Sequence, residues 1–422
     1  MFSKNKNIQF PKNFLWGAST SAHQVEGGNI NDWSEWEESP ERLKKLHESG
    51  LIEQFGMENF ISQKTADHYR LFKKDFQLAK DLGHNATRFS IEWSRIEPEE
   101  GKFSEKEIQR YIGVVDHLRE LGIEPFITLW HWTIPVWLRN KGGWNNKKTI
   151  AYFVRFTKKI LESFGNKIVF WITLNEPEIY TTNSYLTGIW PPQKNNPWKY
   201  VKVLHHLAAA HRQAYQVIKQ INSKAQVGIA KNNIYFEPHK NKIHNRLIKK
   251  IIHYWWNDYF LKRIKKQQDF IGVNYYFHNV VNMGFFKNEN KIISDLGWEL
   301  YPEGIFHVLK DLKKYQKPIY ITENGVADEG HLKRKWFIVE IIKQLHLAIA
   351  DGVDLRGYLH WSLLDNFEWA DGFRARFGLI EVDYKTHERK IRSSAHLYKE
   401  IVTQNGLTED ILKKHEENNL NK

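Results

Sequence analysis

Two glutamates, Glu176 and Glu323, stand in the sequence contexts that say most about chemistry. Glu176 lies in the run TLNEP at residues 173–177, and Glu323 lies in ITENG at residues 321–325. In each run an apolar, β-branched stretch stops at the glutamate and a turn-forming residue follows. In a barrel of parallel strands, catalytic side chains emerge at such strand ends. Two carboxyl groups brought together there are the equipment for cleaving a glycosidic bond.

The flanking residues assign different roles to the two carboxyls. Asn175 precedes Glu176 and supplies an amide donor for a sugar 2-hydroxyl, so we assign Glu176 as the general acid/base. Glu323 is then the nucleophile, and a cation and a hydroxyl donor must keep it ionised. Arg88 and Tyr276 are the candidates for these two groups. Either glutamate alone could instead be structural, as a carboxylate paired with an arginine. Only a closed fold brings both together, because they are far apart in the chain.

Short β-rich runs alternate with amphipathic helical patterns along the chain, which is typical of repeated βα units. The predicted helices cover residues 65–82, 105–121, 148–164, 199–221 and 335–351. Eight predicted strands cover residues 14–19, 86–90, 125–130, 169–175, 227–231, 270–274, 319–323 and 355–361. Eight such units close into a (β/α)₈, or TIM, barrel. No linker divides residues 1–422, so we predict a single catalytic domain with a short polar tail from about residue 406.

Polar and aromatic side chains gather just after these strands. Glu26 and Glu92 follow the first two strands. The groups that we expect to hold or stack on a sugar are Gln24, His131, Trp132, Asn274, Trp361, Glu368 and Trp369. Each of them alone is more often structural, as a histidine bonded to backbone or a tryptophan in a core. Their placement on one rim favours a shared function.

Composition excludes several classes of protein. The 422 residues contain no cysteine, so disulfides play no part. No long apolar run predicts a membrane span, and no secretory signal begins the chain, so we expect a cytoplasmic enzyme with no membrane partner. The net charge of +13 could suggest nucleic acid, but paired lysines on predicted helices explain most of it. Only residues 239–266 are lopsidedly basic, and we interpret them as a solubility or packing surface.

Metal and cofactor motifs are weak. His205, His206 and His211 have a spacing that does not share one helix face well, so satisfied helix histidines are the better interpretation. Phosphate-binding loops rich in glycine are absent. We therefore expect no metal and no organic cofactor.

The chain resembles glycoside hydrolase family 1, the β-glucosidase family, along essentially its whole length. Residues 10–27 are similar to the family's N-terminal signature, and residues 88–96 are similar to its second-strand motif. The TLNEP and ITENG runs match its acid/base and nucleophile motifs. Residues 361–369 and 376–379 complete the set, in an order that is very specific.

The resemblance implies a retaining mechanism and a glycone subsite built from the strand-end residues named above. It also implies that Trp298 lines the aglycone side and that Phe377 contacts substrate. Members acting on 6-phosphorylated sugars resemble this chain but lack a glutamate at the position of Glu368, whose charge would repel phosphate. Thioglucosidases of the family lack the acid carboxylate that Glu176 supplies.

We therefore predict a retaining exo-β-glycosidase that acts on a small β-glycoside or short oligosaccharide. Glucose is the predicted glycone, with some activity on galactosides or fucosides. The alternatives are a 6-phospho-β-glycosidase and a catalytically silent sugar-binding relative. The connection from Ala230 to Asp269 is short for the family, which predicts an open cleft that accepts varied aglycones.

Overall fold

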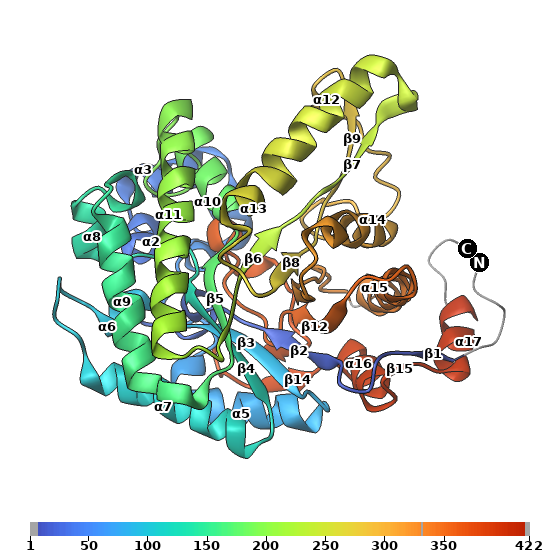
Figure 1. Ribbon diagram of the computed structural model, residues 1–422, viewed down its shortest axis with the longest axis horizontal. Helices are drawn as coiled ribbons and strands as arrows, with labels where there is room; N and C mark the ends of the chain where they lie inside the picture. The colour runs from blue at the N-terminus through green and yellow to red at the C-terminus, as the bar shows by residue number, and fades with distance from the viewer. Residues whose placement is uncertain (1–6, 331, 418–422) are drawn as a thin grey trace.

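The computed structural model describes residues 7–330 and 332–417. At its centre is a closed barrel of parallel strands in the spatial order β11-β12-β2-β3-β4-β5-β6-β8 (Figure 1). The strands are β2 Leu15–Ser19, β3 Ala86–Ser90, β4 Glu124–Trp130, β5 Phe170–Asn175, β6 Gln226–Asn232, β8 Ile271–Asn274, β11 Ile319–Glu323 and β12 Leu355–Trp361. Each lies within one residue of a predicted strand at both ends. The predicted (β/α)₈ barrel is confirmed.

The sequence of each strand fits a position that is covered on both faces. All residues of β3 and of β11 are buried, which is the usual condition of parallel strands enclosed by helices. Apolar side chains fill the interior of the barrel at the end where the strands begin. Phe126 and Phe170 stack there with ring centroids 4.1 Å apart, and Phe270 and Tyr320 close the same layer. The polar chemistry is therefore confined to the other end.

Helices surround the barrel and bury one face each against it. In α9, the buried residues include Ile150, Phe153, Ile160 and Phe164, which recur at helical spacing. The helix α11 begins at Pro197, and the Asn196 side chain accepts a hydrogen bond from the Lys199 N–H. The covering helices are α5 His68–Asp81, α7 Glu105–Glu120, α9 Thr149–Phe164, α11 Pro197–Ile221, α13 Tyr259–Ile264, α14 Glu303–Leu312, α15 Leu332–Ala350 and α16 Ser393–Thr403, whereas α12 Ile243–His253 packs on β7 and β9 outside the barrel.

Shorter helices lie in the connections. The α-helical ones are α1 Ala22–Val25, α2 Asp32–Glu37, α3 Pro40–Glu48, α4 Leu51–Phe55, α6 Trp93–Ile96, α8 Val136–Asn140, α10 Pro177–Thr181 and α17 Glu409–Glu417. The 3₁₀ and π turns are η1 Met57–Phe60, η2 Gly143–Asn145, η3 Gly165–Lys167, η4 Thr182–Leu186, η5 His239–Asn241, η6 Tyr254–Asp258, η7 Lys313–Tyr315 and η8 Trp369–Arg374.

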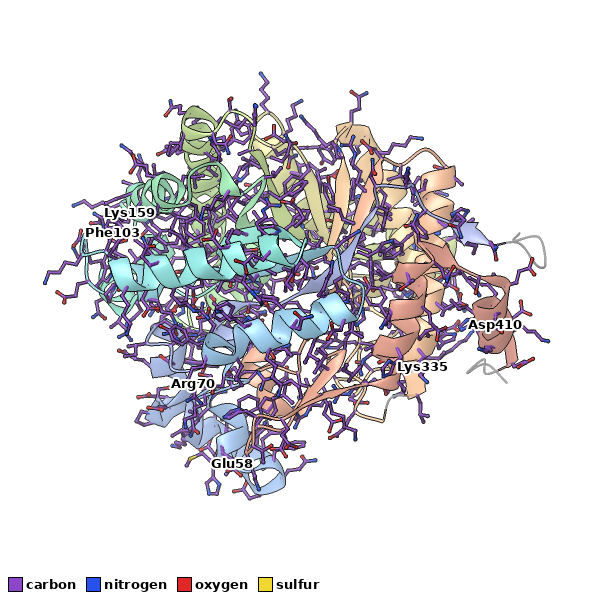
Figure 2. All side chains as sticks on the ribbon, turned by 90° about the horizontal axis from the view of Figure 1, so that it is seen from below. Glu58, Arg70, Phe103, Lys159, Lys335 and Asp410 are labelled. Atoms are coloured by element: carbon purple, nitrogen blue, oxygen red, sulfur yellow. The ribbon has the colours of Figure 1, made fainter. Side chains whose placement is uncertain are left out.

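Small sheets lie outside the barrel. Strand β1, Ile8–Gln9, pairs with β15, Gly406–Leu407, so the segment after Asn405 begins against the start of the chain. A second sheet contains β7 Tyr235–Pro238, β9 His278–Asn282 and β10 Phe285–Phe286, and a third contains β13 Ile380–Val382 and β14 Arg389–Ile391. Charged side chains such as Glu58 and Asp410 lie at the periphery (Figure 2). Within residues 7–330 and 332–417, every helix is too short or too polar to cross a membrane.

Candidate active site

Arg88 is fully buried at the carboxyl-terminal end of the barrel, where it contacts residues of three other strands. Its guanidinium forms an ion pair with Glu323 and donates through Nη2 to Asn175 Oδ1 at 2.7 Å. Its Nε donates to Thr128 Oγ1 at 2.9 Å. One cation from β3 is thereby joined to the ends of β4, β5 and β11. Because guanidinium donors have a fixed planar geometry, Arg88 sets the relative positions of these groups.

Glu323 receives donors at both of its oxygens. Oε1 faces Arg88, and Oε2 accepts a hydrogen bond of 3.1 Å from the Tyr276 hydroxyl. Its side chain is almost completely buried. The cation and the hydroxyl are the two groups that the sequence predicted for this carboxylate, and the structure places both in contact with it.

Among the residues that the structure describes, Glu176 contacts amide donors and no cation. Its Oε1 accepts from Asn274 Nδ2 at 2.8 Å and from Asn232 Nδ2 at 3.3 Å. The same Asn274 amide also donates to Asn175 Oδ1 at 3.2 Å. Asn175 and Asn274 therefore link the surroundings of the two glutamates, although the glutamates come from different strands.

These surroundings separate the proton affinities of the two carboxyls. Burial raises the pKa of Glu176 to about 8, and the negative charge of Glu323 contributes to the rise. Burial also raises the pKa of Glu323, but Arg88 and the Tyr276 hydrogen bond oppose it there. Arg88 and Tyr276 therefore favour the ionised form of Glu323, whereas the surroundings of Glu176 favour its protonated form.

A small cavity of about 150 Å³ opens above the two carboxyls. Its lining includes most of the predicted site residues, namely Gln24, His131, Trp132, Glu176, Tyr276, Trp298, Glu323, Trp361, Glu368, Trp369 and Phe377. Of the other three, Arg88 contacts Glu323, Asn274 contacts Glu176, and Asn175 bonds to both Arg88 and Asn274. The structure thus brings together all fourteen residues singled out from the sequence.

His131 is held as a neutral donor. Asn175 Oδ1 accepts from Arg88 and Asn274, so its Nδ2 must point at His131 Nε2, 3.1 Å away. His131 Nε2 then accepts, and Nδ1 carries the hydrogen. Burial and the charge of Arg88 lower the pKa of His131 well below its usual value. Nδ1 is buried and has no hydrogen-bond partner among the described residues, and His131 lines the cavity.

Gln24 and Glu368 form the far wall of the cavity. Gln24 Nε2 donates to Phe367 O at 3.0 Å and lies 3.3 Å from Glu368 Oε2, while Ser21 donates to Gln24 Oε1. Burial raises the pKa of Glu368 well above its usual value, and nearby acids including Asp371 add to the shift. A carboxyl without a cation beside it is suited to neutral hydroxyl partners.

Aromatic rings build the rest of the wall, and the backbone is unusual beside them. Trp369 packs against Trp132 with centroids 4.7 Å apart, and His131 stacks on Trp369 at 5.9 Å. Trp132, Trp369 and Glu176 adopt φ of 76°, 51° and 41°. Left-handed backbone at a residue other than glycine costs about 1–3 kcal/mol, and such conformations cluster at functional sites. They turn these three side chains toward one cavity.

Sequence reasoning missed several groups at the site. Asn232 contacts Glu176 and directly follows the predicted strand 227–231, so the rule that located Asn175 could have found it. Lys231 and Glu178 form a fully buried ion pair of 3.3 Å behind Glu176, and Lys231 Nζ also donates to Asn232 O. Trp190 lines the cavity from a loop with no periodic pattern, so no signal marked it.

Two strand-end acids that the sequence placed near the rim serve other networks. Glu26 is paired with Arg95 and Arg110 and accepts from Tyr111. Glu92 accepts from the Thr133 hydroxyl at 2.9 Å. Both acids are absent from the cavity lining. They stabilise the loops that carry the rim.

One cluster among residues 7–330 and 332–417 has the composition of a metal site, and it lies elsewhere. His253, Asp258 and Asp311 place ligand atoms within 4.8 Å of one another. Lys314 Nζ already lies 2.8 Å from Asp258 and 2.9 Å from Asp311. An ammonium group therefore occupies the position that a cation would take.

Comparison with known proteins agrees with this geometry. The profile of the family described as Glycosyl hydrolase family 1 matches residues 6–264 and 252–407. A 1,4-β-D-glucan glucohydrolase from Thermotoga neapolitana is 33% identical over 455 residues, which cover 95% of this chain and 100% of that protein.

Solved structures are similar over nearly the whole chain. A β-glycosidase from Pyrococcus horikoshii superposes with a TM-score of 0.87 at 37% identity, covering 97% of this chain and 98% of the other. A β-glucosidase from Thermotoga maritima in complex with glucoimidazole also gives a TM-score of 0.87, at 32% identity, covering 95% of this chain and 100% of that one.

Proposed function

The chain belongs to glycosyl hydrolase family 1 and is a glycoside hydrolase, and from this premise we propose that it is a retaining exo-β-glycosidase with β-glucosidase activity. The observation that carries the proposal is the unequal pair of buried carboxyls. Glu323 is in contact with a cation and a hydroxyl donor, whereas Glu176 is in contact with amides alone.

The first step uses each carboxyl in the state that its surroundings favour. Ionised Glu323 attacks the anomeric carbon and forms a glycosyl ester, while protonated Glu176 gives its proton to the departing oxygen. The Tyr276 hydroxyl and Arg88 orient the attacking oxygens and release them as the charge moves onto the substrate. Asn175 is the amide placed to hold the 2-hydroxyl, whose hydrogen bond strengthens as positive charge develops on the sugar.

The second step follows from the coupling between the two carboxyls. Esterification removes the charge of Glu323, which is one cause of the raised pKa of Glu176. The pKa of Glu176 then falls, and this carboxylate accepts a proton from the incoming water. Water attacks the ester from the face that the leaving group vacated, so the product keeps the β configuration.

The glycone contacts favour an unphosphorylated hexose. His131, Gln24 and Glu368 line the cavity and match hydroxyl groups, and Trp361 and Trp369 offer faces for the sugar ring. Within the described residues the cavity lining contains no lysine or arginine, so a 6-phosphate would find no cation there. Glucose is our first choice, followed by galactose and fucose.

The aglycone side of the cavity should accept leaving groups of different size. Trp298 and Phe377 line the cavity, with ring centroids 6.1 Å apart. We propose that they stack on the leaving group and that the short connection after β6 leaves room for aglycones of different size.

We also propose that the described residues act as one catalytic domain, since the pairing of β15 with β1 joins the first and last described strands.

A panel of 4-nitrophenyl glycosides tests the proposal. The expected order of kcat/KM is glucoside first, then galactoside and fucoside, with the glucoside 6-phosphate far slower. Proton NMR of the first turnovers should show the β-anomer before mutarotation. A faster 6-phosphate would establish the phosphoglycosidase alternative, and an α-anomer as first product would contradict the retaining mechanism.

A further inference from the structure

Helix α12 and the sheet beside it extend away from the barrel (Figure 1). The outer side of α12 carries Ile243, Leu247 and Ile251 in a row four residues apart, and these side chains are 74%, 57% and 60% exposed. Tyr254 and Trp255 continue the exposed row into η6. We call this row, from Ile243 to Trp255, the α12 face.

The fold does not need the α12 face for its own packing. The adjacent strip of the helix supplies Ile248 and Ile252, and η6 supplies Trp256; these side chains pack on a satellite core of Ile234, Phe236 and Val281. The apolar side of α12 is therefore wider than the part that this core covers, and the α12 face is the uncovered part. An exposed apolar row on a projecting element indicates an interaction surface.

The adjoining hairpin adds to the same projecting end. Met283 donates its backbone N–H to Asn245 Oδ1 of α12 at 2.8 Å, which ties the turn between β9 and β10 to the helix. Met283, Phe285 and Phe286 are 68%, 78% and 55% exposed. The hairpin thus presents three further large apolar side chains beside α12.

The segment that contains α12 is strongly basic, although Asp311 and Glu237 of neighbouring elements lie near it. The segment from residue 239 to residue 266 has lysine and arginine throughout and a single acid, Asp258. That acid is buried and lies 2.8 Å from Lys314, so it does not neutralise the outer surface. Among the residues that the structure describes, Arg246, Lys249 and Lys250 form no ion pair with an acid.

We propose that the α12 face docks this enzyme onto the surface of a lipid bilayer rich in anionic headgroups. Apolar side chains flanked by lysine and arginine on one helix are the pattern of an interfacial helix that lies in the plane of a membrane surface. Each lysine or arginine near such a surface adds to the attraction. The docking is peripheral, and it departs from our sequence-based expectation of no membrane partner.

Two other occupants fit less well. A second copy of the chain across a two-fold axis would set one basic face against another, and like charges repel. Nucleic acid would use the charges but would leave the apolar row of α12 and the three hairpin side chains without a role. The experiment below distinguishes dimer formation and nucleic-acid binding from binding to a bilayer.

The test is flotation of the full-length enzyme with vesicles. Vesicles of phosphatidylglycerol and phosphatidylcholine in equal parts are compared with pure phosphatidylcholine, at 50 mM and at 500 mM salt. The enzyme should float with the anionic vesicles at low salt and remain largely unbound with the neutral ones. High salt should reduce the bound fraction, because screening weakens the charge contribution.

Two double variants and two matched controls assign the binding to this face. Arg246→Glu with Lys250→Glu, and Leu247→Gln with Ile251→Gln, should each lower the partition coefficient for anionic vesicles at least about tenfold. Lys73→Glu with Lys74→Glu on α5, and Trp198→Gln with Leu332→Gln, change equally exposed side chains elsewhere and should bind like the parent. All four should keep the parent's rate on a soluble nitrophenyl glycoside, which verifies folding.

Several results would overturn the proposal. One is failure of the parent enzyme to float with anionic vesicles, and another is an equal loss of binding in the control variants. Sedimentation velocity showing a dimer that Leu247→Gln with Ile251→Gln dissociates would assign the face to a second copy. Salt-sensitive binding to duplex DNA, without vesicle binding, would assign it to nucleic acid.

Discussion

Glu176 and Glu323 occupy equivalent places at the ends of two barrel strands, but their surroundings differ in charge. Arg88 is in contact with Glu323, and a tyrosine hydroxyl completes its shell. Glu176 has two asparagine amides, and burial leaves it with a pKa of about 8. The difference teaches that the role of a carboxyl is set by its neighbours, since the two side chains are chemically the same. Removing the groups that make the two carboxyls differ tests this relation.

Removing the carboxylate of Glu323 should have the largest effect. In Glu323→Ala, kcat on 4-nitrophenyl glucoside should fall by about 10⁴-fold or more, because no group remains to form the glycosyl ester. Added azide should restore turnover and give the α-glycosyl azide. The control is Glu120→Ala, which removes an exposed glutamate on α7 and should leave kcat unchanged. Near-parental activity in Glu323→Ala would exclude Glu323 as the nucleophile.

Removing the carboxyl of Glu176 should depend on the leaving group. In Glu176→Ala, a 2,4-dinitrophenyl glucoside needs no protonation and should retain a rate of glycosylation within about tenfold of the parent. An alkyl glucoside should lose about 10²–10⁴-fold, the usual contribution of general acid catalysis. Single-turnover kinetics across a series of phenols measures this slope. Equal losses for good and poor leaving groups would contradict the assignment.

Deleting the tyrosine hydroxyl should weaken Glu323 without removing it. Tyr276→Phe loses one donor to the carboxylate, and a hydrogen bond to a charged group contributes about 1.5–3 kcal/mol, so kcat/KM should fall about 10–100-fold. The lost donor stabilised the ionised form, so the pKa of Glu323 should rise. The acid limb of the kcat/KM profile should therefore move to higher pH. A fall in rate with an unmoved acid limb would show that Tyr276 acts on the substrate alone.

Removing one amide from Glu176 should have the smallest effect. Activity requires protonated Glu176, so the parent's kcat/KM should decline as pH rises through about 8. In Asn232→Ala the carboxylate form loses a donor, its pKa rises, and the alkaline limb should move to higher pH with a change in rate of only about tenfold or less. Asn233→Ala is the matched control, since neither carboxyl bonds to the Asn233 amide. An equal shift in both variants would contradict a specific role for Asn232.

The sequence was most informative where periodicity and turn chemistry coincide. Strands 86–90, 319–323 and 355–361 were predicted with the bounds that the structure has, because an apolar run and a polar strand end mark both limits. Helix α15 begins three residues before its predicted start. Asp328 Oδ2 accepts from the backbone N–H of Lys333 and Arg334, so an acid outside the usual capping position extends the helix.

The contacts that distinguish the two glutamates were only partly readable. Arg88 and Tyr276 were named because a nucleophile needs a cation and a donor, and the structure confirms their contacts with Glu323. Asn232 could have been found by the strand-end rule, but the buried Lys231–Glu178 pair depends on how the end of β6 approaches α10. No local pattern encodes that approach. The exposed row on α12 was hidden for a similar reason, because the sequence shows a broad apolar side of the helix and does not state which part of it is covered.

The central claim is that Glu323 forms the covalent bond to the sugar, and mass spectrometry of a trapped enzyme tests it most directly. Incubation with 2,4-dinitrophenyl 2-deoxy-2-fluoro-β-glucoside should inactivate the enzyme and add one fluoroglucosyl group per chain. After proteolysis, the added mass should lie on Glu323 in the peptide that carries ITENG. A label on Glu176, or rapid turnover of the fluoroglucoside by Glu323→Ala, would contradict the account.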